Sequence, residues 1–116
     1  MNKHTYSNLG LAPGEHPGRA VLIHIRRRGL TIATAAAEIG MSSSVLRNVV
    51  NGLVSMYPGT ALLIEQWAPH LKAHDLVHIQ ADHYLHLARR RADDPNWPAA
   101  GMPIMHRVRH EEEAAA

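Results

Sequence analysis

The residues whose types and spacing suggest chemistry lie between positions 43 and 51. Five polar side chains there fall on one face of a helix: Ser43, Ser44, Arg47, Asn48 and Asn51. Short hydroxyls, carboxamides and a guanidinium are groups that can contact base edges and phosphates in the major groove of DNA. The same pattern also occurs on the solvated face of ordinary small helical bundles, so the pattern alone favours the two interpretations about equally.

Two short helices are expected to position these side chains. Thr31 is a candidate N-cap for an alanine-rich helix over residues 32–39, and Gly40 follows it where a left-handed residue commonly ends a helix. Ser42 is a candidate N-cap for a second helix, which Gly52 ends in the same way. Two capped helices with a glycine turn between them are typical of a DNA-binding helix-turn-helix.

The second helix also has an apolar face. Leu46, Val49 and Val50 recur at the spacing of a buried stripe, opposite the polar side chains. The sequence therefore predicts that residues 43–51 form a recognition helix with its polar face outward.

The composition is that of one small domain without cysteine chemistry. Hydrophobic residues make up 46% of the 116 residues, which suffices for a modest core. The absence of cysteine excludes disulfides, thiolate metal ligands and a cysteine nucleophile. No apolar run reaches the length of a membrane span and the first residues lack the apolar segment of a signal peptide, so we expect a cytoplasmic protein with no membrane partner.

The charge is unevenly distributed along the chain. Residues 1–91 contain ten Lys or Arg and five Asp or Glu, whereas residues 92–116 contain two and five. A basic body suits a polyanionic partner, and an acidic end repels one.

The chain is predicted to form one all-α domain of five helices with flexible termini. Residues 1–15 have no periodic pattern and are expected to be a mobile arm, and residues 92–116 form a Pro- and Gly-containing tail with an acidic end. The domain between them, residues 16–91, contains the helix pair and three further helices.

Pro and Gly residues mark the ends of those three helices. They are expected from Pro17 to about Arg28, from Pro58 to Trp67, and from about Leu71 to Arg91. Ala61, Leu62 and Ile64 are expected to pack inward. Arg26, Arg27 and Arg28 favour the C-terminal end of the first helix and can also contact phosphate.

Five segments carry a family resemblance, and they occur in a specific order: HPGRAVL at 16–22, GLTIATAAAEIGMS at 29–42, SSVLRNVVNG at 43–52, Pro58 followed by ALLI at 61–64, and IQADHYL at 79–85. In this order and spacing they resemble the HigA-like antitoxins, a branch of the Xre/Cro-type helix-turn-helix proteins.

The resemblance implies a lambda-repressor-like fold and a homodimer that binds a palindromic operator in double-stranded DNA. It also implies a cognate toxin of the RelE-like ribonuclease type, which the protein neutralises while repressing its own operon. The positions that match the family's DNA-facing residues are Thr31, Ser42, Ser43, Ser44, Arg47, Asn48 and Asn51.

The sequence departs from the family pattern at some of its DNA contacts. Ile32 and Leu53 stand where the family usually has a glutamine and a basic residue. Two alternatives therefore stay open. One is a stand-alone or prophage Xre-type repressor, and the other is a protein-interaction module that keeps the fold without reading an operator.

A partner-binding surface is predicted on the fourth helix. Leu63 and Trp67 lie four residues apart and share a face that the core does not require. Aromatic side chains often dominate interfaces, so these two are the candidate partner-binding residues. The alternative is that Trp67 is an ordinary core residue.

The ten histidines raise the question of a metal site. A row of residues follows at four-residue steps: His70, His74, His78, Asp82 and His86. Two imidazoles one turn apart can chelate Zn²⁺ or Ni²⁺, but a four-residue step drifts by about 40° around a helix, so the row cannot converge on one ion. We assign no metal site. No nucleophile stands beside a base and no glycine-rich phosphate loop is present, so neither an enzyme nor a cofactor is expected.

Overall fold

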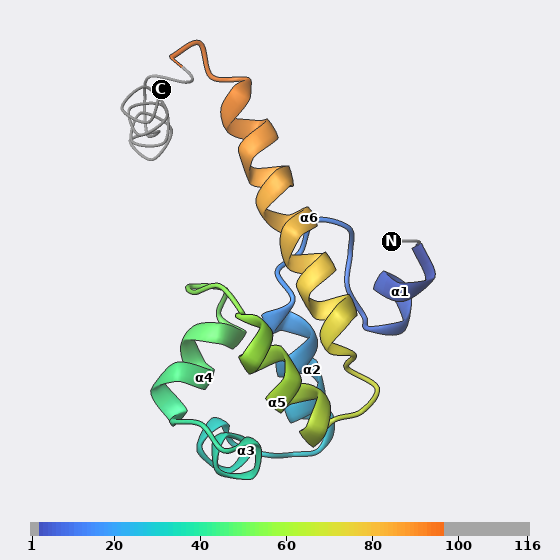
Figure 1. Ribbon diagram of the computed structural model, residues 1–116, viewed down its shortest axis with the longest axis vertical. Helices are drawn as coiled ribbons and strands as arrows, with labels where there is room; N and C mark the ends of the chain where they lie inside the picture. Colours follow the sequence, from blue (N-terminus) through green and yellow to red (C-terminus); the bar gives the residue numbers. More distant parts are fainter. Residues whose placement is uncertain (1–2, 97–116) are drawn as a thin grey trace, which may run out of the picture. The chain divides into compact units, whose positions relative to one another are not determined.

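The computed structural model describes residues 3–96, with side chains from Thr5 onward, and in that part of the chain it contains six α-helices and no strand (Figure 1). They are α1 (Lys3–Asn8), α2 (Gly18–Arg27), α3 (Ile32–Ile39), α4 (Ser43–Val50), α5 (Pro58–Trp67) and α6 (Ala73–Ala92). The chain divides into two compact units, Met1–Leu85 and His86–Ala116. The all-α prediction is confirmed, and the five predicted helices correspond to α2–α6, but a sixth helix that was not predicted precedes them.

The additional helix is α1, which lies in the segment expected to be a mobile arm. Tyr6, Leu9 and Leu11 from this segment are buried in the core, and the Tyr6 hydroxyl donates a hydrogen bond to Asp82 Oδ2 at 2.7 Å. A helix of six residues is too short for a helical period to be visible in the sequence. Its burial depends on contacts with residues far away in the chain.

Helix α2 follows the predicted pattern. Val21 and Ile25 are buried, and Leu22 packs partly against the core. The helix ends before Gly29, whose φ of 66° lies in the left-handed region. The Leu30 N–H then bonds back to the Ile25 carbonyl at 3.0 Å, as at a glycine-terminated helix end.

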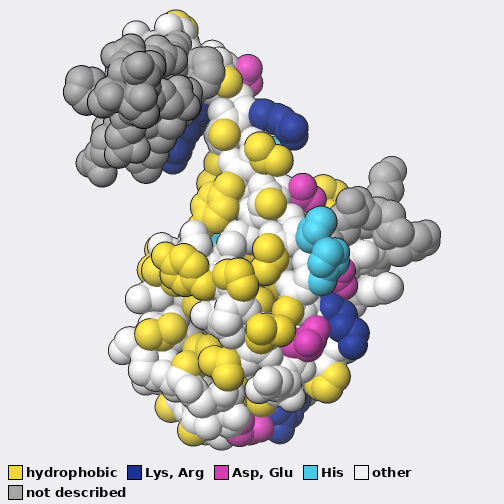
Figure 2. All heavy atoms as spheres, in the orientation of Figure 1, with side chains coloured by type: hydrophobic (Ala, Val, Ile, Leu, Met, Phe, Trp, Pro, Cys, Tyr) yellow, Lys and Arg dark blue, Asp and Glu magenta, His cyan; other side chains and the backbone are white. Residues whose placement is uncertain are grey.

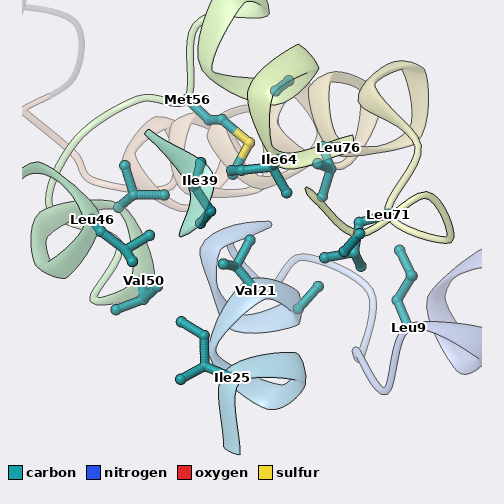
Figure 3. Close-up of a cluster of buried hydrophobic side chains, with 14 of the residues drawn as sticks. Leu9, Val21, Ile25, Ile39, Leu46, Val50, Met56, Ile64, Leu71 and Leu76 are labelled. Atoms are coloured by element: carbon teal, nitrogen blue, oxygen red, sulfur yellow. The ribbon is translucent and has the colours of Figure 1, made fainter. Parts of the chain in front are cut away.

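Aliphatic side chains from several helices meet in one core without any phenylalanine (Figure 3). The largest fully buried side chains come from α2, α4, α5, α6 and the connecting loops, and they include Ile25, Leu46, Met56, Ile64, Leu71, Leu76 and Ile79. On α5 the buried positions are Ala61 and Ile64, followed after the helix by Ala68. Leu62 lies off this stripe and is 51% exposed, so its predicted inward packing is wrong.

Hydrogen bonds from polar side chains hold the loop before α5 and the start of α6 in place. Gln80 Nε2 donates to the Met56 carbonyl at 2.9 Å, and Gln80 Oε1 accepts the Met56 N–H, so one side chain holds the loop before α5. The Ala73 N–H at the start of α6 bonds to Glu65 Oε1 at 3.0 Å. Within the described residues, no helix combines the length and apolar character needed to cross a membrane.

The predicted boundary at residue 92 differs from the division of the chain into compact units, which falls inside α6 after Leu85. Helix α6 ends at Ala92. Most of the predicted tail, residues 97–116, lies outside the described residues.

Candidate nucleic-acid interface

Both helices of the predicted pair begin with the expected side-chain caps. Thr31 Oγ1 accepts the Thr34 N–H at 3.1 Å, and Ser42 Oγ accepts the Val45 N–H at 3.2 Å. Between the helices, Gly40 has a φ of 96°, and the Met41 N–H bonds back to the Ala36 carbonyl at 3.0 Å. Because local side-chain chemistry determines both caps and the turn, the sequence predicted them correctly.

The apolar face of α4 is buried as predicted. Leu46 and Val49 are 0% and 1% exposed, and Val50 is 7% exposed. Helix α4 packs against α3 and α2, and α3 also packs against α5. The buried side chains on α3 include Ala35 and Ala36, which allow helices to approach closely because they are small.

The opposite face of α4 brings most of the candidate DNA-contacting residues together. Ser44, Arg47, Asn48 and Asn51 are exposed, and Ser43 is half-buried. In the described part of the chain, the Arg47 guanidinium makes neither an ion pair nor a hydrogen bond. Thr31 and Ser42 lie instead at the N-cap positions, where their hydroxyl oxygens already accept backbone hydrogen bonds.

The three arginines at the end of α2 are exposed but not equivalent. Arg28 forms an ion pair with Glu38 at 3.0 Å, and its guanidinium lies 5.7 Å from the centre of the Trp67 ring. Arg26 and Arg27 have no ion-pair partner among the described residues. They are therefore better placed than Arg28 to contact a phosphate.

Trp67 makes several contacts within the protein. It is half-buried, it donates from Nε1 to Glu38 Oε1 at 3.4 Å, and its ring meets that of His24 edge-on at 4.9 Å. Leu63, on the same helix, is 38% exposed. Trp67 thus joins α5 to α2 and α3, and partner binding through Leu63 and Trp67 stays a prediction.

More exposed apolar side chains lie elsewhere, on and before α5. Leu53 and Tyr57 are each 71% exposed, and Leu62 is 51% exposed. Figure 2 shows hydrophobic side chains gathered over α5 and the loop that precedes it. A shallow groove of about 350 Å³ adjoins them, lined by Pro58, Leu62, Ala73, His74 and Val77. The sequence contained one indication of this exposed apolar surface: Leu53 stands where the resembled family usually has a basic residue.

The histidines lie in pairs, and one pair comes from the row at four-residue steps. His70 precedes α6 and lies against His24, with ring centres 4.7 Å apart, while His74 and His78 lie 4.3 Å apart on α6. Within residues 3–96, no group of three or more His, Asp or Glu side chains is arranged to hold a metal ion.

A third pair lies at the end of α4. The rings of His16 and His83 meet edge-on at 5.1 Å. Burial is the main cause that lowers the pKa of His16, and the charge of His83 adds to it. Burial likewise lowers the pKa of His24, with smaller contributions from His70 and the nearby arginines. Sequence reasoning found neither the contact between His16 and His83 nor that between His24 and His70, because the members of each are far apart in the chain.

No protein-family model and no curated protein matches the chain. The functional interpretation therefore depends on the geometry of α3 and α4 and on the resemblance in the sequence.

Proposed function

We propose that the protein is a DNA-binding transcriptional repressor in which α3, the turn at Gly40 and α4 form a helix-turn-helix. One observation supports this most directly: most of the polar face of α4 is exposed and Arg47 has no ion-pair or hydrogen-bond partner among the described residues, while the opposite face is buried. The Ser42 side-chain cap and the left-handed Gly40 in the turn before it fix the start of this helix. A rigid, polar, exposed helix is what major-groove reading requires.

The chemistry of this face suggests which residues read bases. The Arg47 guanidinium can bond to guanine O6 and N7 as a bidentate donor, and the Asn48 and Asn51 carboxamides can do the same for adenine. Arg27 lies at the end of α2, outside the proposed recognition helix, and is therefore assigned to the DNA backbone. Phosphate contacts of this kind carry no sequence information.

The resemblance of residues 16–85 extends the proposal to a biological role. We infer a homodimer that binds a palindromic operator, represses its own operon, and neutralises a RelE-like ribonuclease toxin as the antitoxin of a type II toxin–antitoxin module. A dimer would place two copies of α4 about 34 Å apart, one helical turn of DNA. Light scattering in the presence and absence of DNA tests this assembly, and a strict monomer on DNA would contradict it.

Titration of two arginine variants tests base reading. The probes are a duplex from the region upstream of the protein's own reading frame and a random duplex of equal length, each at two salt concentrations. Arg47→Ala should weaken binding to the upstream duplex by about 1–3 kcal/mol and reduce discrimination between the duplexes. Arg27→Ala should weaken both alike and lower the salt slope by about 1. Equal weakening of both duplexes by Arg47→Ala would show that α4 does not read bases.

The exposed apolar side chains favour a second candidate function, a protein-interaction module that keeps the fold without reading an operator. Leu53 and Tyr57 lie in the loop between α4 and α5 and are mostly exposed, where a DNA-binding protein benefits from basic residues. If this candidate is correct, wild-type protein will bind both duplexes weakly and without preference. A clear preference for the upstream duplex favours the repressor.

A further inference from the structure

The C-terminal end of α4 is held by a contact that contains two histidines. His16 precedes α2, and its ring meets the rings of His83 and Tyr84 on α6 edge-on, with centres 5.1 and 6.4 Å apart. The His83 ring is fixed in turn by a hydrogen bond of 2.8 Å between its Nδ1 and the Gly14 carbonyl. His16 also lies against Gly52, the residue that ends α4. This contact therefore joins the segment before α2, the end of α4 and α6.

The hydrogen bonds of His16 require its neutral form. Nδ1 accepts the Gly18 N–H at 3.0 Å, so this nitrogen carries no proton. Nε2 then carries the proton, and it is inaccessible to solvent without a hydrogen bond of ordinary geometry. A second proton can bind only at Nδ1. It would turn an acceptor into a donor that faces another donor, the Gly18 N–H.

That hydrogen bond lies at a close approach of α2 to α4. A Cβ atom added to Gly18 would lie 1.9 Å from the backbone oxygen of Val49, so the first turn of α2 touches the last turn of α4 through its backbone. Loss of the bond between His16 and Gly18 would thus act directly on the position of α4.

We propose that His16 and His83 form a pH-sensitive contact that holds the end of α4 when His16 is neutral and releases it when His16 is protonated. Positive charge on His83 opposes a proton on His16, and protonated His16 loses its bond to Gly18. As a mechanism that regulates DNA binding, this rests on the proposed function.

The surroundings of the pair offer little compensation for positive charge. The groups that face His16 are Tyr84 and His83 on α6, the Gly18 N–H, and the Val54 carbonyl in the loop after α4. The nearest acids along the chain have other partners. Glu15 pairs with Arg19 at 3.6 Å, and Asp82 accepts the Tyr6 hydroxyl.

The direction of the pH effect follows from proton linkage. The pKa of His16 is lowered in the folded protein, mainly by burial and then by His83, so the unfolded chain binds the proton more tightly. The contribution of neutral His16 to the free energy of unfolding is therefore fully present above the ordinary histidine pKa of about 6.5. It decreases as the pH falls below that value. Protonation of His16 alone can raise the unfolding equilibrium constant by up to about tenfold for each pH unit below that value.

Two variants keep the hydrogen bonds but cannot be protonated. In His16→Asn the side-chain oxygen can accept the Gly18 N–H, and in His83→Asn the side-chain nitrogen can donate to the Gly14 carbonyl. We expect both to lose a smaller part of their stability than wild type between pH 7 and pH 5 in urea denaturation. His86→Asn, at an exposed position of α6 with no ring contact among the described residues, is the matched control and should keep the wild-type pH dependence.

Nuclear magnetic resonance distinguishes a proton-driven contact from a merely structural one. In wild type, the amide signals of Asn51 and Gly52 should shift with the same midpoint as His16, and in His83→Asn the pKa of His16 should rise. If the stability of His16→Asn and His83→Asn depends on pH as in wild type, or the amide signals at the end of α4 do not follow His16, the proposal is wrong.

Binding to the two duplexes adds a functional result. At pH 5.5 wild type should lose its preference for the upstream duplex, whereas His16→Asn should keep it. A preference in wild type that does not change with pH would overturn the regulatory role. Absence of any preference at pH 7.5 would instead contradict the proposed function, and the stability and amide results would still decide whether the contact is pH-sensitive.

Discussion

The contact between α2 and α4 makes a strong prediction for the variant Gly18→Ala. The added Cβ would lie 1.9 Å from the Val49 oxygen, whereas ordinary van der Waals contact begins at 3.4 Å, so the two helices would have to separate by 1.5 Å. The obstructing atoms belong to the backbone, and no side-chain rotation can relieve them.

The cost of this separation can be estimated. Overpacking in a core typically costs about 1–3 kcal/mol, and a backbone obstruction lies at the upper end. Alanine in place of glycine within a helix gains about 1 kcal/mol, which offsets part of the loss. We therefore expect Gly18→Ala to lower the free energy of unfolding by about 2 kcal/mol, a factor of roughly 30 in the unfolding equilibrium constant.

Gly59→Ala is the matched control, because Gly59 also lies in the first turn of a helix and nothing lies within 4 Å of its added Cβ. That variant should be more stable than wild type by about 0.5–1 kcal/mol. Urea denaturation of both variants at pH 7.5 gives the comparison. If Gly18→Ala were as stable as Gly59→Ala, the first turn of α2 would not touch the end of α4, and the account of how α4 is held would be wrong.

Three further variants test other parts of the fold. Leu46→Ala, at a fully buried position, should cost about 2–5 kcal/mol in urea denaturation, whereas Leu53→Ala, at an exposed position in the loop after α4, should change stability by less than about 0.5 kcal/mol. Similar values would mean that Leu46 is not buried in the core. Ser42→Ala should cost about 0.5–2 kcal/mol through loss of the N-cap, and Ser44→Ala should not. Burial and the bond to Asp82 raise the pKa of Tyr6 to about 12, so wild type should lose stability between pH 10 and 12. Tyr6→Phe should lack both this loss and the tyrosinate absorbance that appears near pH 12, and an unchanged absorbance titration would contradict the contact.

The parts of the fold that the sequence predicted correctly depend on neighbouring residues. A Thr or Ser cap before α3 and α4, Pro17 before α2, a glycine after each helix, and apolar residues at steps of three and four determine these helices almost residue by residue. The same local patterns predicted the buried positions Leu46, Val49 and Val50.

The parts that it missed depend on residues far apart in the chain. Helix α1 is stabilised by the burial of Tyr6 and by its bond to Asp82, which is 76 positions away. The exposure of Leu62 follows from the rotation of α5, which α3 and the rest of the core determine. Spacing within a short segment contains no information about such contacts.

The candidate site contains residues that also hold the fold together and residues that do not. This difference decides which variants are informative about DNA binding. Thr31 and Ser42 each cap a helix, so replacing either one disturbs the fold together with any DNA contact. The Arg47 side chain has no ion-pair or hydrogen-bond partner among the described residues, so its removal leaves the network of bonds around α4 unchanged. A loss of discrimination in Arg47→Ala at unchanged stability can therefore be attributed to the DNA contact itself, whereas the same loss in Ser42→Ala cannot.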